Sequence, residues 1–134
     1  MQPQPDMADL VLDASAMVDL LLGEQFGAAV TTRISGHTLN APAHFDAEVL
    51  SALGRMSRAG DLSPETVERD LEFLVTAPIH MHDLSQLVLD AWQKRHQLRL
   101  VDALYVQLAI NLNCPLITTD ARLKSSPNVE VVQV

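Results

Sequence analysis

The sequence predicts an α/β fold, a three-layer α/β/α sandwich with a central parallel sheet. Short apolar runs alternate along the chain with longer segments of helical periodicity, the order expected when helices connect parallel strands. The runs are apolar at nearly every position, as in strands covered on both faces. With 48% hydrophobic but only 4% aromatic residues among 134, the core must be aliphatic, and we expect a single domain over residues 9–134.

In the first half of the chain, turn and cap residues mark where the elements end. Gly23, Gly36 and Gly60 each follow a helical segment, and Pro42 precedes one. The first strand is an apolar run that ends in an acid. The predicted elements are a strand at 9–13, a helix at 14–23, a helix at 25–35, a weak strand at 38–41 and a helix at 43–59.

The second half continues the alternation. Ser63 is the expected N-cap of a helix whose first position is Pro64. Asp83 or Ser85 is expected to cap the helix that follows the third strand. The predicted elements are a helix from 63 to about 76, a strand at 79–82, a helix from there to about 96, a helix at 101–112, a strand at 115–119, a helical turn at 121–124 and a strand at 129–132.

The N-terminus and the single cysteine indicate a cytoplasmic protein. Residues 1–8 are rich in proline and glutamine, so we expect a short disordered tail, and either Met1 or Met7 can be the native start. The segment lacks the basic and apolar regions of a signal peptide. No apolar run approaches the roughly 20 residues of a membrane span. Cys114 alone can form neither an internal disulfide nor a cysteine zinc cluster, and a reducing compartment fits.

The charge balance argues against a partner held by a broad basic surface. The chain has nine Lys and Arg against 17 Asp and Glu, a formal net charge of −8. Proteins that bind nucleic acid usually neutralise phosphates with Lys and Arg. A nucleic-acid substrate would therefore require bound cations, a local basic rim or a second subunit.

Four carboxylates stand at predicted junctions between elements. Asp13 and Asp120 each end a strand and precede a helix, and Asp102 opens a helix. Each of these three can be an ordinary helix cap or first-turn acid. Glu48 is less easily explained, because it lies at the edge of the apolar stripe of its helix, where a carboxylate needs a partner. A partly buried Glu48 paired with an arginine is the alternative.

Sheet topology makes these four acids one candidate site. Parallel strands end at the same edge of a sheet, and ligands bind beyond that edge, so Asp13 and Asp120 should lie close together. The helix that leads into the last of these strands begins at the same edge with Asp102, and the helix of Glu48 also begins there. Four carboxylates at one place repel one another, and Mg²⁺ or Mn²⁺ would neutralise them because hard cations prefer oxygen ligands.

Four segments resemble the PIN domain, specifically the VapC-type toxins of bacterial toxin–antitoxin pairs. They occur in the family's order and at similar spacing from Asp9 onward. The segments are Val11-Leu12-Asp13-Ala14-Ser15-Ala16, Glu48-Val49-Leu50-Ser51-Ala52-Leu53, Val101-Asp102-Ala103-Leu104-Tyr105-Val106-Gln107-Leu108-Ala109 and Leu116-Ile117-Thr118-Thr119-Asp120-Ala121-Arg122-Leu123.

The resemblance implies an endoribonuclease that depends on Mg²⁺, with Mn²⁺ as a possible substitute. The four acids fall on the family's acidic positions, and we expect them to bind the metal, with Glu48 as a ligand or as the group that orients the attacking water. Ser15 and Thr118 fall on hydroxyl positions that line the family's site. The implied partners are RNA, a cognate VapB-type antitoxin and a second copy of the chain.

Three arginines near the acids are candidates to bind phosphates that flank the cleaved bond, namely Arg55, Arg99 and Arg122. Solvated helix-end charges are the competing interpretation for each. The competing function is a non-catalytic interaction module with the same fold. A receiver domain or an aspartate phosphatase is disfavoured, because Ala14 and Ser15 stand where their second acid would be.

Overall fold

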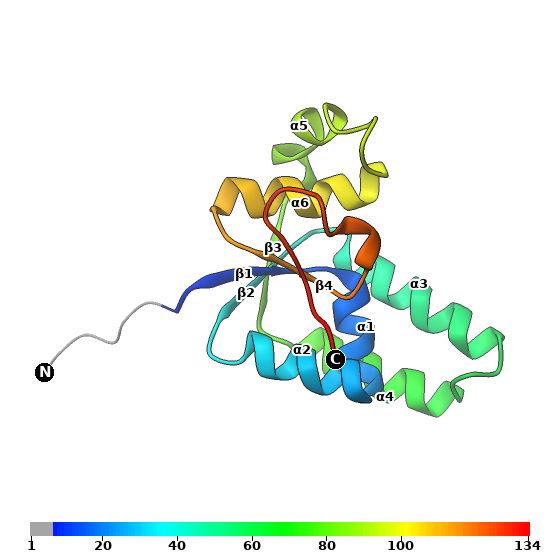
Figure 1. The fold of residues 1–134 in the computed structure, drawn as a ribbon. Helices are drawn as coiled ribbons and strands as arrows, with labels where there is room; N and C mark the ends of the chain where they lie inside the picture. The colour runs from blue at the N-terminus through cyan, green and yellow to red at the C-terminus, as the bar shows by residue number, and fades with distance from the viewer. Residues whose placement is uncertain (1–6) are drawn as a thin grey trace, which may run out of the picture.

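A five-stranded parallel sheet forms the middle layer of the molecule (Figure 1). The structure is a computed structural model and describes residues 7–134. The sheet order is β3-β2-β1-β4-β5, with β1 at the centre. The strands are β1 (Asp9–Leu12), β2 (Thr38–Pro42), β3 (Ile79–His82), β4 (Leu116–Thr118) and β5 (Val129–Val131).

Helices cover both faces of this sheet, which confirms the predicted sandwich. Figure 1 shows α1 to α4 on one side of the sheet and α5 with α6 on the other. The helices are α1 (Ala14–Leu22), α2 (Gln25–Ile34), α3 (Phe45–Arg58), α4 (Pro64–Thr76), α5 (Val88–Trp92) and α6 (Leu100–Leu112), and two short 3₁₀ helices are η1 (Leu84–Gln86) and η2 (Ala121–Leu123). None of the helices in the described part of the chain has the length and apolar character to cross a bilayer.

Most element boundaries agree with the prediction to within two residues. Gly23, Gly36 and Gly60 all adopt positive φ, and Ser63 caps α4 by accepting a hydrogen bond from the amide of Thr66. The prediction was wrong for the helix expected up to residue 96. That segment is divided into η1 and the short α5, with Leu87 at φ −117° between them and turns after Trp92.

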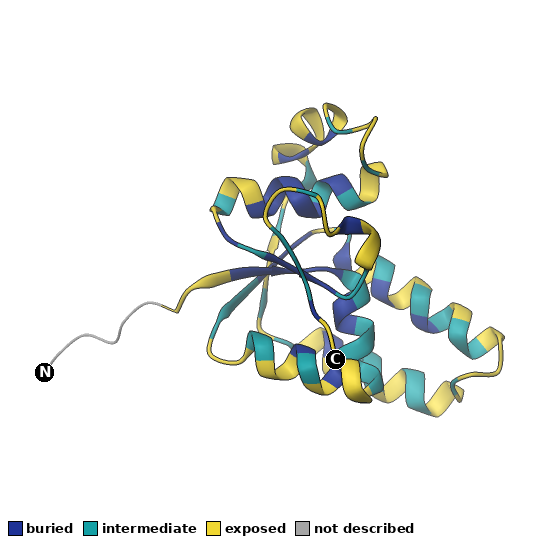
Figure 2. Ribbon diagram, in the orientation of Figure 1, coloured by how far each residue is buried: buried dark blue, intermediate teal, exposed yellow. Residues whose placement is uncertain are grey.

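Strand register brings the candidate site together at one edge of the sheet. Strand β1 pairs with both β2 and β4, and Leu12 lies opposite Ile117. The ends of these strands that lead to the site are buried, and Figure 2 shows buried segments in dark blue. Because Leu12 and Ile117 are in register, Asp13 and Thr118 leave adjacent strands side by side. The tail predicted for residues 1–8 falls mostly on residues 1–6, which lie outside the described part, so it stays a prediction.

Helices α1 and α2 approach each other so closely that one position admits only glycine. A Cβ atom added at Gly27 would lie 2.4 Å from the carbonyl oxygen of Asp19 and 3.3 Å from that of Leu20. These are backbone atoms, so they cannot move without moving helix α1. Since α1 begins at Asp13, this packing also fixes the direction in which the chain leaves the site.

We expect Gly27→Ala to lower the free energy of unfolding by about 3 kcal/mol, because the helices must separate to admit the methyl group. Gly54→Ala is the matched control. It lies within α3, where the added Cβ would meet only the Arg58 side chain at 3.8 Å, and it should stabilise by about 0.5–1 kcal/mol. Urea unfolding of both variants measures the difference, and equal stabilities would contradict the close α1–α2 packing.

Candidate active site

Asp13 is the buried acid of the site. It lies between β1 and α1 with only 5% of its surface exposed. Its backbone is extended, and its Oδ1 atom accepts hydrogen bonds from the Ala16 amide at 2.9 Å and the Ser15 hydroxyl at 2.7 Å. Asp13 is thus the N-cap of α1, as the simpler interpretation predicted. Capping leaves its Oδ2 atom available for another partner.

Ser15 and Thr118 connect Asp13 to the strand that leads to Asp120. Their hydroxyl oxygens lie 3.1 Å apart, and Thr118 Oγ1 accepts a hydrogen bond from the Asp120 amide at 3.0 Å. Ser15 also donates to Asp13 Oδ1, so it joins the Thr118 hydroxyl to the Asp13 carboxylate. The two predicted hydroxyl positions therefore form a chain of hydrogen bonds between β1 and the end of β4.

Asp102 and Asp120 each pair with a nearby arginine. Arg99 donates to Asp102 from Nε at 2.8 Å and from Nη2 at 3.3 Å. Arg122 donates to Asp120 from Nε at 3.0 Å and Nη2 at 2.5 Å. Hydrogen bonding to Arg122 holds the pKa of Asp120 below its usual value. Both arginines are largely exposed, whereas the two carboxylates are largely covered.

Two residues that the sequence did not identify hold Glu48. The Tyr105 hydroxyl donates to Glu48 Oε1 at 2.7 Å, and His44 Nε2 lies 3.3 Å from the same oxygen. His44 Nε2 also lies 3.2 Å from the Val101 carbonyl oxygen, and its ring packs against that of Tyr105 at 4.8 Å. Facing two acceptors, Nε2 is assigned the ring proton. The predicted alternative, an arginine partner for Glu48, is not what the structure shows.

The spacing along the helices carried a signal for both of these residues. His44 precedes Glu48 by four residues, which places the two on one helix face. Tyr105 follows Asp102 by three residues, which places the two on one face of α6. It is 2% exposed, and burial beside the Glu48 carboxylate raises the pKa of its hydroxyl well above the ordinary value.

The acids lie close enough to influence one another, although their carboxylates do not converge as placed. The charge of Asp102 contributes to raising the pKa of Asp13, and Arg99 contributes to lowering the pKa of Asp120. Within residues 7–134, however, no three His, Cys, Asp or Glu side chains are grouped tightly enough to hold a metal ion. Asp13 and Thr118 leave adjacent strands, and Asp102 and Asp120 are turned to arginines, so the predicted site of four acids stays a prediction.

The donor chemistry of the site nevertheless fits a hard divalent cation. Burial raises the pKa of Asp13 to about 6, against an ordinary value of 3.8, and hydrogen bonds from Thr118, Ala16 and Ser15 only partly oppose this. A buried carboxylate with a second acid beside it is stabilised by a cation. Asp102 and Asp120 already bind cationic groups, the guanidinium ions of their arginines. All of these donors are oxygen atoms, which Mg²⁺ and Mn²⁺ prefer.

The third predicted arginine, Arg55, lies on α3 and lines a cavity together with Glu48. Arg55 Nη1 donates to the Ser51 hydroxyl at 2.8 Å. It lines a cavity of about 310 Å³ between α1 and α3, and Ser15 and Glu48 line the same cavity. The three arginines predicted to bind phosphate therefore all border the acidic site, Arg55 from α3 and the others from the α6 and η2 side.

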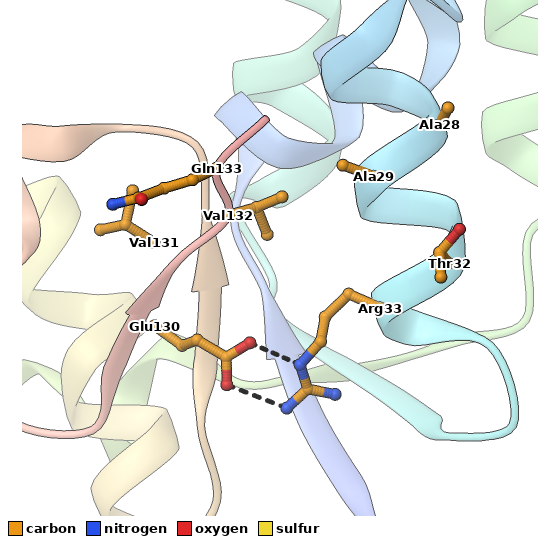
Figure 3. Close-up of a pocket in the computed structure, with 8 residues that line it drawn as sticks. All are labelled: Ala28, Ala29, Thr32, Arg33, Glu130, Val131, Val132 and Gln133. Carbon is orange, nitrogen blue, oxygen red and sulfur yellow. Dashed lines mark hydrogen bonds and ion pairs between the residues drawn. The ribbon is translucent and has the colours of Figure 1, made fainter.

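A cavity larger than the one beside Glu48 is separate from the acids. It has a volume of about 520 Å³ and lies between α2 and β5, where Arg33 and Glu130 form two hydrogen bonds (Figure 3). In Figure 3, Glu130 and Arg33 point toward each other across it, and the other lining side chains are mostly small. None of the four acids lines this cavity. The Arg33–Glu130 pair attaches α2 to the edge strand.

The fold is an α/β/α domain with acids at one edge of its sheet, and comparison with known proteins identifies the family. The family model of the PIN domain matches residues 10–127. The chain is 51% identical to Ribonuclease VapC3 of Mycobacterium tuberculosis over 122 residues, which are 90% of this chain and 89% of the relative. The chain belongs to the PIN domain family. Within that family it is a VapC-type PIN protein.

Solved structures show the same fold at low sequence identity. VapC20 of Mycobacterium tuberculosis is 13% identical, with a TM-score of 0.70 over 92% of this chain and 99% of that one. VapBC2 of Rickettsia felis, solved with a DNA fragment of its promoter, is 16% identical, with a TM-score of 0.63 over 93% of this chain and 99% of that one. The α/β/α arrangement is therefore shared across members whose sequences have diverged widely.

In metal-free buffer, we expect the stability of the wild type to fall relative to Asp13→Asn as the pH rises from about 4 to 7. The folded-state pKa of Asp13, about 6, lies above the unfolded value of 3.8, so its contribution is fully present below pH 3.8 and is lost as pH passes 6. The difference should reach about 3 kcal/mol in favour of the variant. Urea unfolding of both proteins with EDTA across this pH range measures it, and a constant difference would contradict the burial of an ionisable Asp13.

Proposed function

We propose that the chain is a divalent-metal-dependent endoribonuclease and the toxin of a type II toxin–antitoxin pair. The observation that carries this proposal is the buried Asp13, held by Ser15 and Thr118 at the sheet edge where three further acids lie. The proposal is supported by the 51% identical relative, which is named a ribonuclease, and by the fold neighbour VapC20, which is described as a toxin that cleaves the sarcin–ricin loop.

Asp13, Asp102, Asp120 and Glu48 are the residues that would hold Mg²⁺, with Mn²⁺ as a substitute. A bound cation of this kind lowers the pKa of a water molecule and neutralises charge on the scissile phosphate. Asp13 is already rigid, because the Ala16 amide and the Ser15 hydroxyl fix its Oδ1 atom. Asp102 and Asp120 would exchange their arginine partners for the cation.

The arginines acquire a second role when they leave the acids. Arg99 and Arg122 have 61% and 66% of their side-chain surface exposed, so each can rotate toward a bound phosphate without unpacking the core. A guanidinium group binds a phosphate through two parallel hydrogen bonds, as it binds a carboxylate. The same two side chains would therefore neutralise the acids in the free protein and the RNA backbone in the complex.

Glu48 is the group best placed to orient the attacking water or to complete the metal site. Tyr105 and His44 hold its Oε1 atom from two directions, so the other oxygen keeps a fixed position. About a third of its side chain is exposed, toward the cavity that Ser15 and Arg55 also line. A fixed carboxylate in contact with solvent can accept a proton from a positioned water molecule.

A cognate VapB-type antitoxin and a second copy of the chain are the proposed partners, in a cytoplasmic setting. The fold neighbour from Rickettsia felis was solved as a VapBC assembly, which supports the first. An exposed apolar patch on α5 and the start of α6 supports the second. Four of its exposed side chains, Val88, Trp92, Leu100 and Val101, line a cavity of about 260 Å³.

A non-catalytic interaction module is the competing function, and one observation favours it: the acids as placed form no group of three. Titration calorimetry with Mn²⁺ distinguishes the two functions. Binding at or below millimolar Mn²⁺ that is lost in Asp13→Asn supports the nuclease. Absence of binding in the wild type supports the module.

Asp13→Asn and Asp102→Asn should each reduce magnesium-dependent cleavage of single-stranded RNA by about a hundredfold or more while the protein stays folded, because each removes a charged metal ligand. Asp46→Asn is the matched control, since Asp46 lies exposed on α3. Cleavage rates of a labelled RNA with purified proteins measure the effect. Unchanged magnesium-dependent cleavage in both site variants would contradict the proposed mechanism.

Tyr105→Phe should lower kcat for RNA cleavage by about tenfold and leave KM nearly unchanged, because it frees Glu48 without altering the arginines. The ring still fills the core, so the variant should unfold cooperatively. Steady-state kinetics with a short RNA measure the two constants. A rise in KM with kcat unchanged would show that Tyr105 supports substrate binding rather than Glu48.

A further inference from the structure

The negative charge of the chain is distributed very unevenly. The segment 94–124 contains five of the nine Lys and Arg and only two acids, Asp102 and Asp120, so its formal charge is +3. The other residues contain four Lys and Arg against 15 acids, a formal charge of −11. This segment runs from the end of α5 through α6 and β4 to η2. The basic rim that a nucleic-acid substrate requires is therefore concentrated in one stretch of chain beside the acids.

Two cationic side chains of this segment, Lys94 and Arg122, line a cavity of about 300 Å³. Lys94 borders it on the α5 side and Arg122 on the η2 side, and Leu98 and Pro127 contribute apolar walls. Ser125 adds a hydroxyl group from the loop after η2. A cavity with cations at its rim, apolar walls and a few hydrogen-bonding groups combines the features that a phosphate and a nucleobase each require.

The Lys94 ammonium is held in place by the buried side-chain amide of Gln107. It donates to Gln107 Oε1 at 2.5 Å, and Gln107 Nε2 donates to Asn111 Oδ1 at 2.8 Å. Gln107 is 5% exposed, in the middle of the apolar helix α6. A buried amide that anchors a lysine fixes the position of the charge before any ligand arrives. A lysine has three N–H donors, so two remain for another group.

Arg122 joins this cavity to the acidic site. Arg122 lines the cavity, and its guanidinium group donates hydrogen bonds to Asp120 at 3.0 and 2.5 Å. A phosphate group bound by Arg122 would therefore lie next to the carboxylates. A strand that passes from the acidic site over Arg122 therefore reaches the cavity that Arg122 lines.

Resting on the proposed function, we infer that this cavity is the binding subsite for a nucleotide of single-stranded RNA next to the scissile phosphate. Lys94 and Arg122 bind its phosphate. The base packs against Leu98 and Pro127, within reach of the Ser125 and Ser126 hydroxyl groups. Because base contacts select sequence whereas phosphate contacts only position the strand, this subsite determines which RNA is cut.

Lys94→Gln tests the phosphate contact, with Lys124→Gln as the matched control, since Lys124 lies beside the cavity without lining it. Fluorescence anisotropy with a short labelled single-stranded RNA in EDTA measures binding without cleavage. We expect Lys94→Gln to weaken binding about tenfold at low salt. Its slope of log affinity against log salt, from about 50 to 200 mM, should decrease by about 0.7, the loss of one phosphate contact. Lys124→Gln should stay within about twofold of the wild type.

A second pair leaves the Lys94–Gln107 contact intact. Ser125→Glu places a negative charge in the cavity and Ser125→Gln a neutral side chain of the same size, so the charged variant should bind the RNA about tenfold more weakly than the neutral one. Competition by nucleoside monophosphates tests the base contact. They should displace the RNA at lower concentration than inorganic phosphate, and equal competition would overturn the base-binding role.

The outcomes separate this inference from the proposed function. A wild type that fails to cleave any RNA with Mg²⁺ contradicts the proposed function, whereas the anisotropy comparison still tests the subsite. A wild type that cleaves RNA, with Lys94→Gln and Ser125→Glu binding as well as their controls, overturns the subsite alone. The subsite is also overturned if these variants weaken only the binding of a protein partner.

Discussion

Burial of the Asp13 carboxylate at the end of the central strand is the constraint on which the rest of the site depends. A carboxylate that is 5% exposed requires hydrogen-bond donors, and the first turn of α1 supplies them through the Ala16 amide and the Ser15 hydroxyl. The helix must therefore start directly after the strand and leave it in one direction. Close packing of α1 on α2 at Gly27 maintains that direction. The same carboxylate, that of Asp13, therefore caps α1 and forms the buried part of the acidic site.

The same constraint explains why hydroxyl groups extend from Asp13 to the neighbouring strand. Thr118 is fully buried in β4, so its Oγ1 atom needs both a donor and an acceptor, and the Asp120 amide and Ser15 provide them. A shift of either strand by one residue would break this chain of hydrogen bonds. Polar contacts at the site therefore stabilise the parallel register between β1 and β4, as the apolar core does.

Much of this organisation was predictable from the sequence, because it follows from local rules. Apolar runs located the strands, and the rule that parallel strands end at one edge placed Asp13 and Asp120 together. The partners of the acids were not predictable in the same way. Tyr105 is separated from Glu48 by 57 residues, so their contact depends on the tertiary fold, which local sequence rules do not supply. The division of the helix expected up to residue 96 also arises from packing, since α5 must fit against α6.

The arginine pairs resolve the apparent conflict between an acidic protein and an RNA substrate. Net charge describes the whole molecule, but a phosphate group responds to the charges within about 10 Å of it, the Debye length at ordinary ionic strength. At the acidic edge those charges include Arg99 and Arg122, each paired with a carboxylate that a metal ion can take over. Metal binding to the acids would therefore release two guanidinium groups for the RNA backbone. It follows that metal and RNA should bind cooperatively. Metal binding frees the arginines for the RNA backbone, and RNA binding to the arginines frees the carboxylates for the metal.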